Sequence, residues 1–361
     1  MTPHAADQRS SFLFAVCQVG AERALKAEVA RLWVDLHFAY SRPGFLTFKL
    51  SEGHQLPDDF NLRSVFARAH GFSLGKVKAS ELSARVAEFW RIAGQRPFET
   101  LHVWQRDTAA CGYRGFDPHV TETAREAEAA IRQAAPAEAR QAATWPSIAA
   151  AGQLVLDCAL VEPDEWWIGY HRATAGPSQF AGGLCEIELP AEAVSRAYLK
   201  MAEALDWSGL PLRPKQHFVE IGCAPGGASQ ALLARGQNVL GIDPAAVDPR
   251  VLAHPKFHHL QKRGADVRRR EFSNVDWLAA DMNVAPDYTL DTVEAIVTHP
   301  SVHIRGLLLT LKLLDWNLAE QVPAYLDRVR RWGYGQVRAR QLAHNRQEIC
   351  VCAVRRKPST R

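Results

Sequence analysis

The chain has 361 residues, of which 47% are hydrophobic and 23% are charged. These proportions are typical of folded, soluble proteins and argue against disordered, collagen-like and coiled-coil classes. The length is two to three times that of a usual single domain, which predicts two packed units. The net charge of +4 is compatible with a nucleic-acid partner but does not demand one.

We expect neither a targeting signal nor a framework of disulfide-bonded cysteines in this protein. The longest apolar run near the start, residues 12–17, is far shorter than a signal-peptide core or a membrane span. We therefore expect a cytoplasmic protein. The seven cysteines are an odd number and lack paired C-x-x-C sets, so we expect them to be reduced and mostly buried. Cys350 and Cys352 alternate on a predicted strand, where packing is the favoured role.

The first half of the chain alternates predicted strands and helices without an internal repeat. Strands are predicted at residues 12–19, 45–50, 100–104, 154–161 and 166–171, and helices at residues 21–33, 80–92 and 121–134. This order indicates an α+β fold. Trp166 and Trp167 point to opposite faces of their strand, so at most one of them is available to a ligand.

Residues 172–187 are rich in Gly, Ala, Ser and Pro, a composition expected where few contacts hold the chain. We place the domain boundary there, with an N-terminal domain at residues 1–187 and a C-terminal domain at residues 188–361. The alternative is a tight turn at Gly182 and Gly183 inside one domain.

The second half has a more regular alternation. Strands are predicted at residues 218–221, 239–242, 277–280, 306–313, 337–340 and 348–354, and helices at residues 195–205, 228–235, 290–297 and 318–332. Apolar strands that alternate with helices indicate an α/β fold, a mostly parallel sheet with helices on both faces. The last two strands, separated by a polar turn, could pair antiparallel at one edge.

A glycine-rich turn carries the sharpest chemical signal. Residues 218–227 read FVEIGCAPGG, and Asp243 lies 21 residues after Gly222, at the end of the next predicted strand. Glycines between a strand and a helix let the backbone approach a ligand closely, and the acid is placed to accept from ribose hydroxyls. The spacing lacks G-x-G-x-x-G and G-x-x-x-x-G-K, which disfavours NAD and ATP. The alternative is a tight turn with no ligand.

These residues resemble the FtsJ-like ribose 2′-O-methyltransferases, a family that uses S-adenosylmethionine. Residues 190–200 (PAEAVSRAYLK), 277–282 (WLAADM) and 309–313 (LTLKL) are similar to further motifs of that family. Residues 339–348 (ARQLAHNRQE) resemble a segment of the RlmM-type ribosomal RNA cytidine methyltransferases.

The resemblance is strong over residues 188–356 and implies a Rossmann-like methyltransferase domain there. Upstream, residues 64–68 (SVFAR) and 167–170 (WIGY) are more weakly similar to the N-terminal region of the RlmM-type enzymes. That similarity implies a ferredoxin-like or THUMP-like RNA-binding region at residues 1–187.

The resemblance also implies a Lys-Asp-Lys-Glu tetrad of catalytic residues: Lys200, Asp281, Lys312 and Glu348. Lys312 would be the general base, Lys200 and Glu348 would position the ribose hydroxyl, and Asp281 would lie near the sulfonium methyl. Two partly desolvated lysines that face one another should lower the pKa of one toward neutrality. Any one of these residues alone would be interpreted as a surface charge or a salt bridge, but all four in the family's order favour a site.

For the cofactor S-adenosylmethionine, the turn and the resemblance together imply a set of contacting residues. They are Ser195, Gly222, Ala224, Pro225, Gly226, Gly227, Asp243 and Asp281. Two departures from the family pattern stand out. Arg263 occupies the position of the acid that contacts adenine, and Asp266 replaces it only if the loop shifts. Residues 314–317 replace a basic loop, which puts the target nucleotide in question.

Basic and aromatic residues are candidates for RNA contacts. The basic ones are Lys262, Arg263, Arg268, Arg269 and Arg270 in one stretch and Arg328, Arg330 and Arg331 in another. They could bind phosphates, although such runs are more often solvated faces. Trp316 could stack on a splayed base or belong to the core. His299 and His303 are four residues apart, but Pro300 intervenes and no third ligand is evident, so we predict no metal site.

Taken together, the sequence predicts an S-adenosylmethionine-dependent ribose 2′-O-methyltransferase that acts on RNA. The predicted substrate is 23S ribosomal RNA or a precursor particle, with cytidine as the candidate target and no membrane or DNA partner. One alternative is a non-catalytic RNA-binding ribosome assembly factor with the same fold, which the Arg263 departure favours and the tetrad opposes. A small-molecule methyltransferase is a second alternative, but it leaves the long N-terminal region and the basic clusters unexplained.

Overall fold

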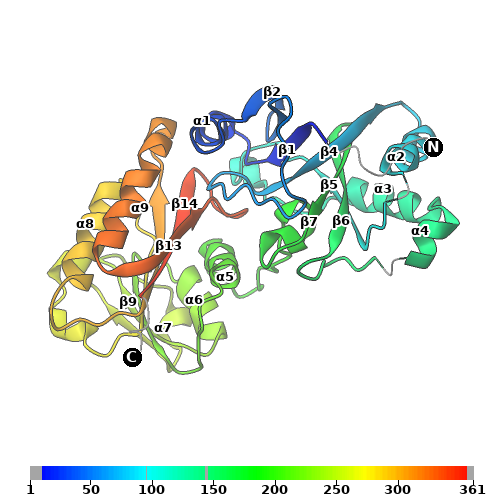
Figure 1. Ribbon diagram of the computed structural model, residues 1–361. Coiled ribbons are helices and arrows are strands. Elements are labelled where there is room, and N and C mark those ends of the chain that lie inside the picture. The colour runs from blue at the N-terminus through cyan, green and yellow to red at the C-terminus, as the bar shows by residue number, and fades with distance from the viewer. Residues whose placement is uncertain (1–9, 95, 143–144, 356–361) are drawn as a thin grey trace, which may run out of the picture. The chain divides into compact units, whose positions relative to one another are not determined.

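The computed structural model describes residues 10–94, 96–142 and 145–355 (Figure 1). The chain divides into two compact units, Met1–Glu186 and Ile187–Arg361.

Unit 1 contains a seven-stranded sheet. Its strands are β1 (Phe12–Val16), β2 (Leu36–Arg42), β3 (Phe45–Leu50), β4 (Ala69–Lys78), β5 (Thr100–Gln105), β6 (Leu154–Glu162) and β7 (Glu165–Arg172). The strand order is β2-β3-β1-β4-β7-β6-β5. Strands β5 and β6 pair parallel, and the other neighbours pair antiparallel. Phe14, Phe45 and Trp104 pack together in a core cluster of this unit.

Helices of unit 1 are α1 (Glu22–Leu32), α2 (Leu82–Ala93), α3 (Glu122–Gln133) and α4 (Ala137–Ala142), with 3₁₀ turns η2 (Tyr113–Gly115), η3 (Pro177–Gln179) and η4 (Ala181–Gly183). The sequence analysis missed β2 and β4. Strand β2 is an edge strand with mostly exposed side chains, and β4 contains Gly71 and Gly75. Neither strand therefore shows a clear apolar alternation.

Residues 172–187 are not the loosely held connection that their composition suggested. Gly182 and Gly183 are buried in η4. A Cβ atom on Gly182 would lie 2.7 Å from the Trp104 ring, and one on Gly183 would overlap the Arg68 carbonyl. At these two positions the backbone packs directly against other parts of unit 1, which leaves room only for glycine. The division between the two units falls after Glu186, at the end of this segment.

Unit 2 contains the second seven-stranded sheet. Its strands are β8 (His217–Ile221), β9 (Asn238–Ile242), β10 (Phe257–Leu260), β11 (Trp277–Ala280), β12 (Gly306–Lys312), β13 (Tyr334–Arg340) and β14 (Glu348–Arg355). The order is β10-β9-β8-β11-β12-β14-β13. The first five strands pair parallel, whereas β14 pairs antiparallel with both of its neighbours. The mostly parallel sheet with an antiparallel edge is therefore confirmed.

Helices of unit 2 are α5 (Ala197–Ser208), α6 (Gly227–Ala234), α7 (Pro249–Leu252), α8 (Pro286–Val297) and α9 (Val322–Arg331), with 3₁₀ turns η5 (Gly264–Asp266), η6 (Arg269–Phe272) and η7 (Trp316–Gln321). Helix α5 packs on α6, and α8 packs on α9. Figure 1 shows these two pairs on opposite faces of the sheet. The short elements β10 and α7 were not predicted, because four residues are too few to show a period.

The described helices include none long and apolar enough to cross a membrane. All seven cysteines are free thiols, and six of them are buried. Cys350 and Cys352 belong to the core cluster that packs against α5 and α6, as their alternation predicted.

Candidate active site

The order of the strands in unit 2 defines a topological switch point. Strand β8 is flanked by β9 on one side and β11 on the other, so the connections that leave β8 and β11 run in opposite directions. In parallel sheets of this kind, ligands bind beyond the carboxyl ends of the strands at that point. Gly222 follows β8 and Asp281 follows β11, directly after the paired residues Ile221 and Ala280.

Gly222 occupies a position that other residues cannot adopt without strain. Its φ is +83°, and a Cβ atom there would lie 2.7 Å from the backbone oxygen of Asp281. The glycine turn and the loop after β11 are therefore in direct contact. Gly227 is equally confined, because a Cβ atom on it would overlap the Ser195 hydroxyl.

Asp243 joins the same turn from the end of β9. Its Oδ2 accepts a hydrogen bond from the Ala224 backbone N–H (3.1 Å), and its Oδ1 accepts one from the Ala245 N–H (2.8 Å). Because a carboxylate oxygen can accept more than one hydrogen bond, the group keeps acceptor capacity for a ligand hydroxyl. The structure thus brings Ser195, the glycine turn, Asp243 and Asp281 to one edge of the sheet.

The four residues of the predicted tetrad converge from four elements. Lys200 lies on α5, Asp281 follows β11, and Lys312 and Glu348 are direct partners across the β12–β14 pair. Lys200 Nζ is 3.1 Å from Asp281 Oδ2 and 2.9 Å from Glu348 Oε1. Lys312 Nζ is 2.9 Å from Asp281 Oδ1 and forms a second ion pair with Glu348 Oε2. Each ammonium group is thus shared by two carboxylates.

This charge balance contradicts the prediction that the pKa of the general-base lysine, Lys312, is lowered. The two lysine side chains are 16% and 15% exposed, so burial does disfavour their charged forms. For Lys312, however, Asp281 and Glu348 outweigh burial and raise the pKa above its ordinary value. The predicted shift toward neutrality is therefore wrong for Lys312 in the protein alone, because this amine faces two carboxylates. Burial tends to raise the pKa of Asp281, but Lys200 and Lys312 lower it overall.

A pocket of about 480 Å³ opens beside the tetrad. Lys200, Lys312 and Glu348 line it, together with Ser195, Arg196 and Arg346. Its volume lies within the range of small-molecule and nucleotide sites. The tetrad lysines therefore have access to a ligand group although they are mostly buried.

Two buried acids near the site were missed by the sequence analysis. Glu203 lies one helical turn after Lys200 and accepts hydrogen bonds from the backbone N–H groups of Ala343 and His344 and from His344 Nδ1. Glu220 on β8 accepts a hydrogen bond from Ser229. Burial, opposed by that bond and reinforced by Asp281 and Asp243, raises the pKa of Glu220 to about 8. Glu203 belongs to no recognised motif; Glu220 lies inside the FVEIGCAPGG segment, where only the glycines indicated a site.

Several predicted RNA-contacting residues have other partners. Arg328 binds Asp291 and Glu294, and Arg330 binds Asp327, so this cluster is largely neutralised. Arg263 and Asp266 are both exposed around η5, as are Lys262, Arg268 and Arg270. Trp316 is half-buried rather than exposed, and of the two adjacent tryptophans Trp166 is buried and Trp167 is half-buried.

The sheet order, the glycine turn and the acids after β9 and β11 define a doubly wound α/β domain with a ligand site at its switch point. Residues 193–322 of this domain match the model of the FtsJ-like methyltransferase family. This match confirms the predicted resemblance and the Rossmann-like methyltransferase fold of the C-terminal domain. The THUMP-like nature of the N-terminal region stays a prediction.

Three curated relatives carry the same name, ribosomal RNA large subunit methyltransferase M. The protein from Halorhodospira halophila is 33% identical over 51% of this chain and 54% of its own length. The proteins from Laribacter hongkongensis and Alkalilimnicola ehrlichii are 30% and 32% identical over 48% of this chain and 51% and 49% of their own lengths. The chain thus spans about half the length of the curated relatives it matches.

Proposed function

We propose that this protein is an S-adenosylmethionine-dependent ribose 2′-O-methyltransferase that acts on 23S ribosomal RNA or a precursor particle, with cytidine as the candidate target. The observation that carries the proposal is the tetrad of Lys200, Asp281, Lys312 and Glu348 beside an open pocket. The names of the curated relatives and the family match support it. Such a substrate would place the protein in the cytoplasm.

The residues at the glycine turn fit the proposed cofactor. Asp243 retains acceptor capacity for ribose hydroxyls. Gly222 has no side chain, so the backbone of the turn can lie directly against Asp281. Ser195, Ala224, Pro225, Gly226 and Gly227 would complete the contacts around the turn. When bound, the cofactor supplies an electrophilic methyl group on a sulfonium.

The tetrad would orient and deprotonate the ribose hydroxyl. Lys200 and Glu348 line the pocket and can hold the 2′-oxygen by hydrogen bonds. Lys312 Nζ would accept the proton, which requires a neutral amine. Asp281 is one of the two carboxylates that raise the pKa of Lys312. A positive charge added near Asp281 would offset that effect, so the pKa of Lys312 would fall when the site is filled. The base would then form only in the loaded site.

The N-terminal unit would dock the RNA. Tyr40 and Trp167 stack with ring centroids 5.6 Å apart, and Lys76 Nζ lies 5.4 Å from the Trp167 ring centroid. Aromatic and cationic groups in contact on one sheet are suited to stack on bases and bind phosphates. Lys76 also pairs with Glu165, so binding there would require exchange of that partner.

Transfer of a labelled methyl group tests the proposal. The purified chain should bind S-adenosylmethionine in calorimetry and methylate ribosomal RNA from cells that lack the gene. RNA from cells that carry the gene is the matched control and should accept little label. Ribose-methyl mapping should show one nucleotide that differs between the two RNAs. A folded protein that binds RNA but neither the cofactor nor a methyl group would favour the non-catalytic assembly factor.

A further inference from the structure

Unit 1 contains a second group of titratable side chains that the proposed function does not use. His102 on β5 and Asp157 on β6 are direct neighbours in the parallel pair, so their side chains share one face of the sheet. His171 on β7 pairs with Val155, two residues before Asp157, and therefore lies on that face too. One nitrogen of each histidine and one oxygen of Asp157 lie within 4.8 Å of one another. We call these three residues the histidine–aspartate cluster.

Two contacts set the orientation of His171. Its Nδ1 is 2.6 Å from Asp157 Oδ2, and its Nε2 is 2.8 Å from the backbone oxygen of Ser178. The Ser178 oxygen only accepts, so Nε2 carries a proton. A neutral ring then points the Nδ1 lone pair at a carboxylate, and these two groups repel unless a cation lies between them. That cation is either a proton or a metal ion.

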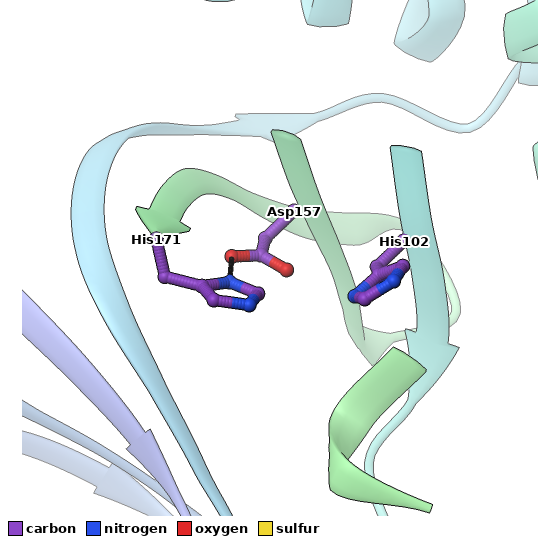
Figure 2. Close-up of side chains that lie close together, drawn as sticks. All are labelled: His102, Asp157 and His171. Carbon is purple, nitrogen blue, oxygen red and sulfur yellow. Dashed lines mark hydrogen bonds and ion pairs between the residues drawn. The ribbon is translucent and has the colours of Figure 1, made fainter. Parts of the chain in front are cut away.

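His102 distinguishes the two cases. The residue is 1% exposed, and in the described part of the chain neither ring nitrogen has a hydrogen-bond partner of normal distance and angle; the Gln179 backbone offers only a weaker contact. Figure 2 shows the Asp157 carboxylate between the two rings, with one oxygen at His171 and the other turned toward His102. A proton shared by His171 and Asp157 leaves the buried His102 ring with only the weak contact to the Gln179 backbone, whereas a metal ion would engage all three side chains.

We propose that His102, Asp157 and His171 bind a divalent transition-metal ion, with zinc as the fitting example. Two imidazoles and a carboxylate are a ligand set that zinc uses with bonds of about 2.0–2.2 Å. His102 is buried beside the other two side chains, and a neutral imidazole there offers a lone pair to a metal ion. The Nε2 bond to the Ser178 carbonyl is the outer contact that metal-bound histidines commonly make.

The ligand atoms need only a small adjustment to bind a metal. Bonds of about 2.0–2.2 Å around a tetrahedral ion hold ligand atoms about 3.4 Å apart. The 2.6 Å contact between His171 and Asp157 would open slightly, and the His102 ring would move toward both. The metal would replace the proton of the His171–Asp157 contact, and that proton would leave to solvent.

Zinc titration of the full chain tests the site. The untagged protein is stripped with a chelator, kept reduced, and titrated with zinc chloride in calorimetry while its thermal unfolding is followed. We expect one zinc per chain and a higher unfolding temperature in the presence of zinc. A wild-type protein that binds no zinc, or whose unfolding temperature zinc leaves unchanged, overturns the proposal.

The variant His102→Phe separates the metal site from a purely structural cluster. It keeps an aromatic ring and removes only the weak contact that the described chain makes between His102 and the Gln179 backbone. A metal site predicts that zinc affinity falls at least about 100-fold. A structural cluster predicts an unchanged response to zinc and stability equal to or above wild type. His119→Phe, at an exposed histidine of the same unit, is the matched control and should bind zinc like wild type.

X-ray absorption of the wild-type zinc complex gives a second measurement that does not depend on folding of a variant. The proposed site predicts only nitrogen and oxygen ligands at about 2.0–2.2 Å, with the signature of two imidazoles. A sulfur shell at about 2.3 Å would assign the zinc to cysteines and overturn the proposal.

Discussion

The tetrad in unit 2 and the histidine–aspartate cluster in unit 1 are both buried groups of titratable side chains, but they differ in how their charges are balanced. The tetrad has two cations and two anions, and every ammonium contacts both carboxylates. The cluster has one carboxylate, one imidazole in hydrogen-bond contact with it, and one ring that has no hydrogen bond of normal geometry to any described residue. The tetrad is complete before any ligand arrives, whereas the cluster becomes complete only with a cation.

The largest expected effect comes from removing one cation of the tetrad. In Lys312→Met, the proposed proton acceptor is lost, and methyl transfer should fall about 10²–10⁴-fold. Affinity for S-adenosylmethionine should stay within about threefold, because the glycine turn is unchanged. Single-turnover transfer and calorimetry measure the two quantities. Lys256→Met is the control, since that amine contacts the Gly236 carbonyl rather than a carboxylate. A normal transfer rate in Lys312→Met would exclude a base at this position.

The equivalent disruption in unit 1 is Asp157→Asn in the zinc-free protein. It leaves the buried His171 without its counter-ion, and the free energy of unfolding should fall by about 3–5 kcal/mol. Urea unfolding measures the loss. Asp164→Asn removes an exposed partner of Lys78 at 3.6 Å and should cost less than about 1 kcal/mol. Equal losses in the two variants would show that the His171–Asp157 contact behaves as a surface pair.

Glu220 is the intermediate case, a buried carboxyl that forms no ion pair with any residue the structure describes. Its pKa in the folded protein, about 8, is above the ordinary 4.5, because burial and the nearby Asp281 and Asp243 disfavour its charge. A raised pKa means that stability is complete below pH 4.5 and is lost as the pH rises through 8. Unfolding free energies at several pH values should therefore decline more for wild type than for Glu220→Gln. We expect a difference of up to about 3 kcal/mol, and parallel curves would contradict it.

The two clusters also differ in how far each could be predicted from the sequence. Lys312 and Glu348 lie in segments with recognisable motifs, and the strands that carry them follow an apolar pattern, so their meeting was predictable. The pKa of Lys312 was not predictable, because it depends on how two anions are divided between two ammonium groups. No recognised motif contains His102, Asp157 or His171. The first two are separated by 55 positions in the sequence and the last two by 14. Only the pairing of β5, β6 and β7 brings them together.

The smallest expected effect concerns the segment that holds Glu348. Asn345 Nδ2 and the Arg346 N–H approach Glu348 Oε1 at 3.4 and 3.3 Å, and Glu203 holds this segment through Ala343 and His344. Glu203 and Lys200 share α5, so the same helix orients both ends of the Lys200–Glu348 pair.

Glu203→Gln replaces one of the accepting oxygens with a donor. We expect kcat to fall about fivefold, the factor for ~1 kcal/mol of a lost hydrogen bond, with cofactor affinity unchanged. Asp206→Asn, at an exposed residue of the same helix that pairs with Arg235, should leave both quantities at the wild-type level. Because a general loss of folding would lower cofactor binding together with kcat, a selective fall in kcat identifies Glu203 as a positioning residue. A parallel loss of both would instead mean that its hydrogen bonds support the domain as a whole.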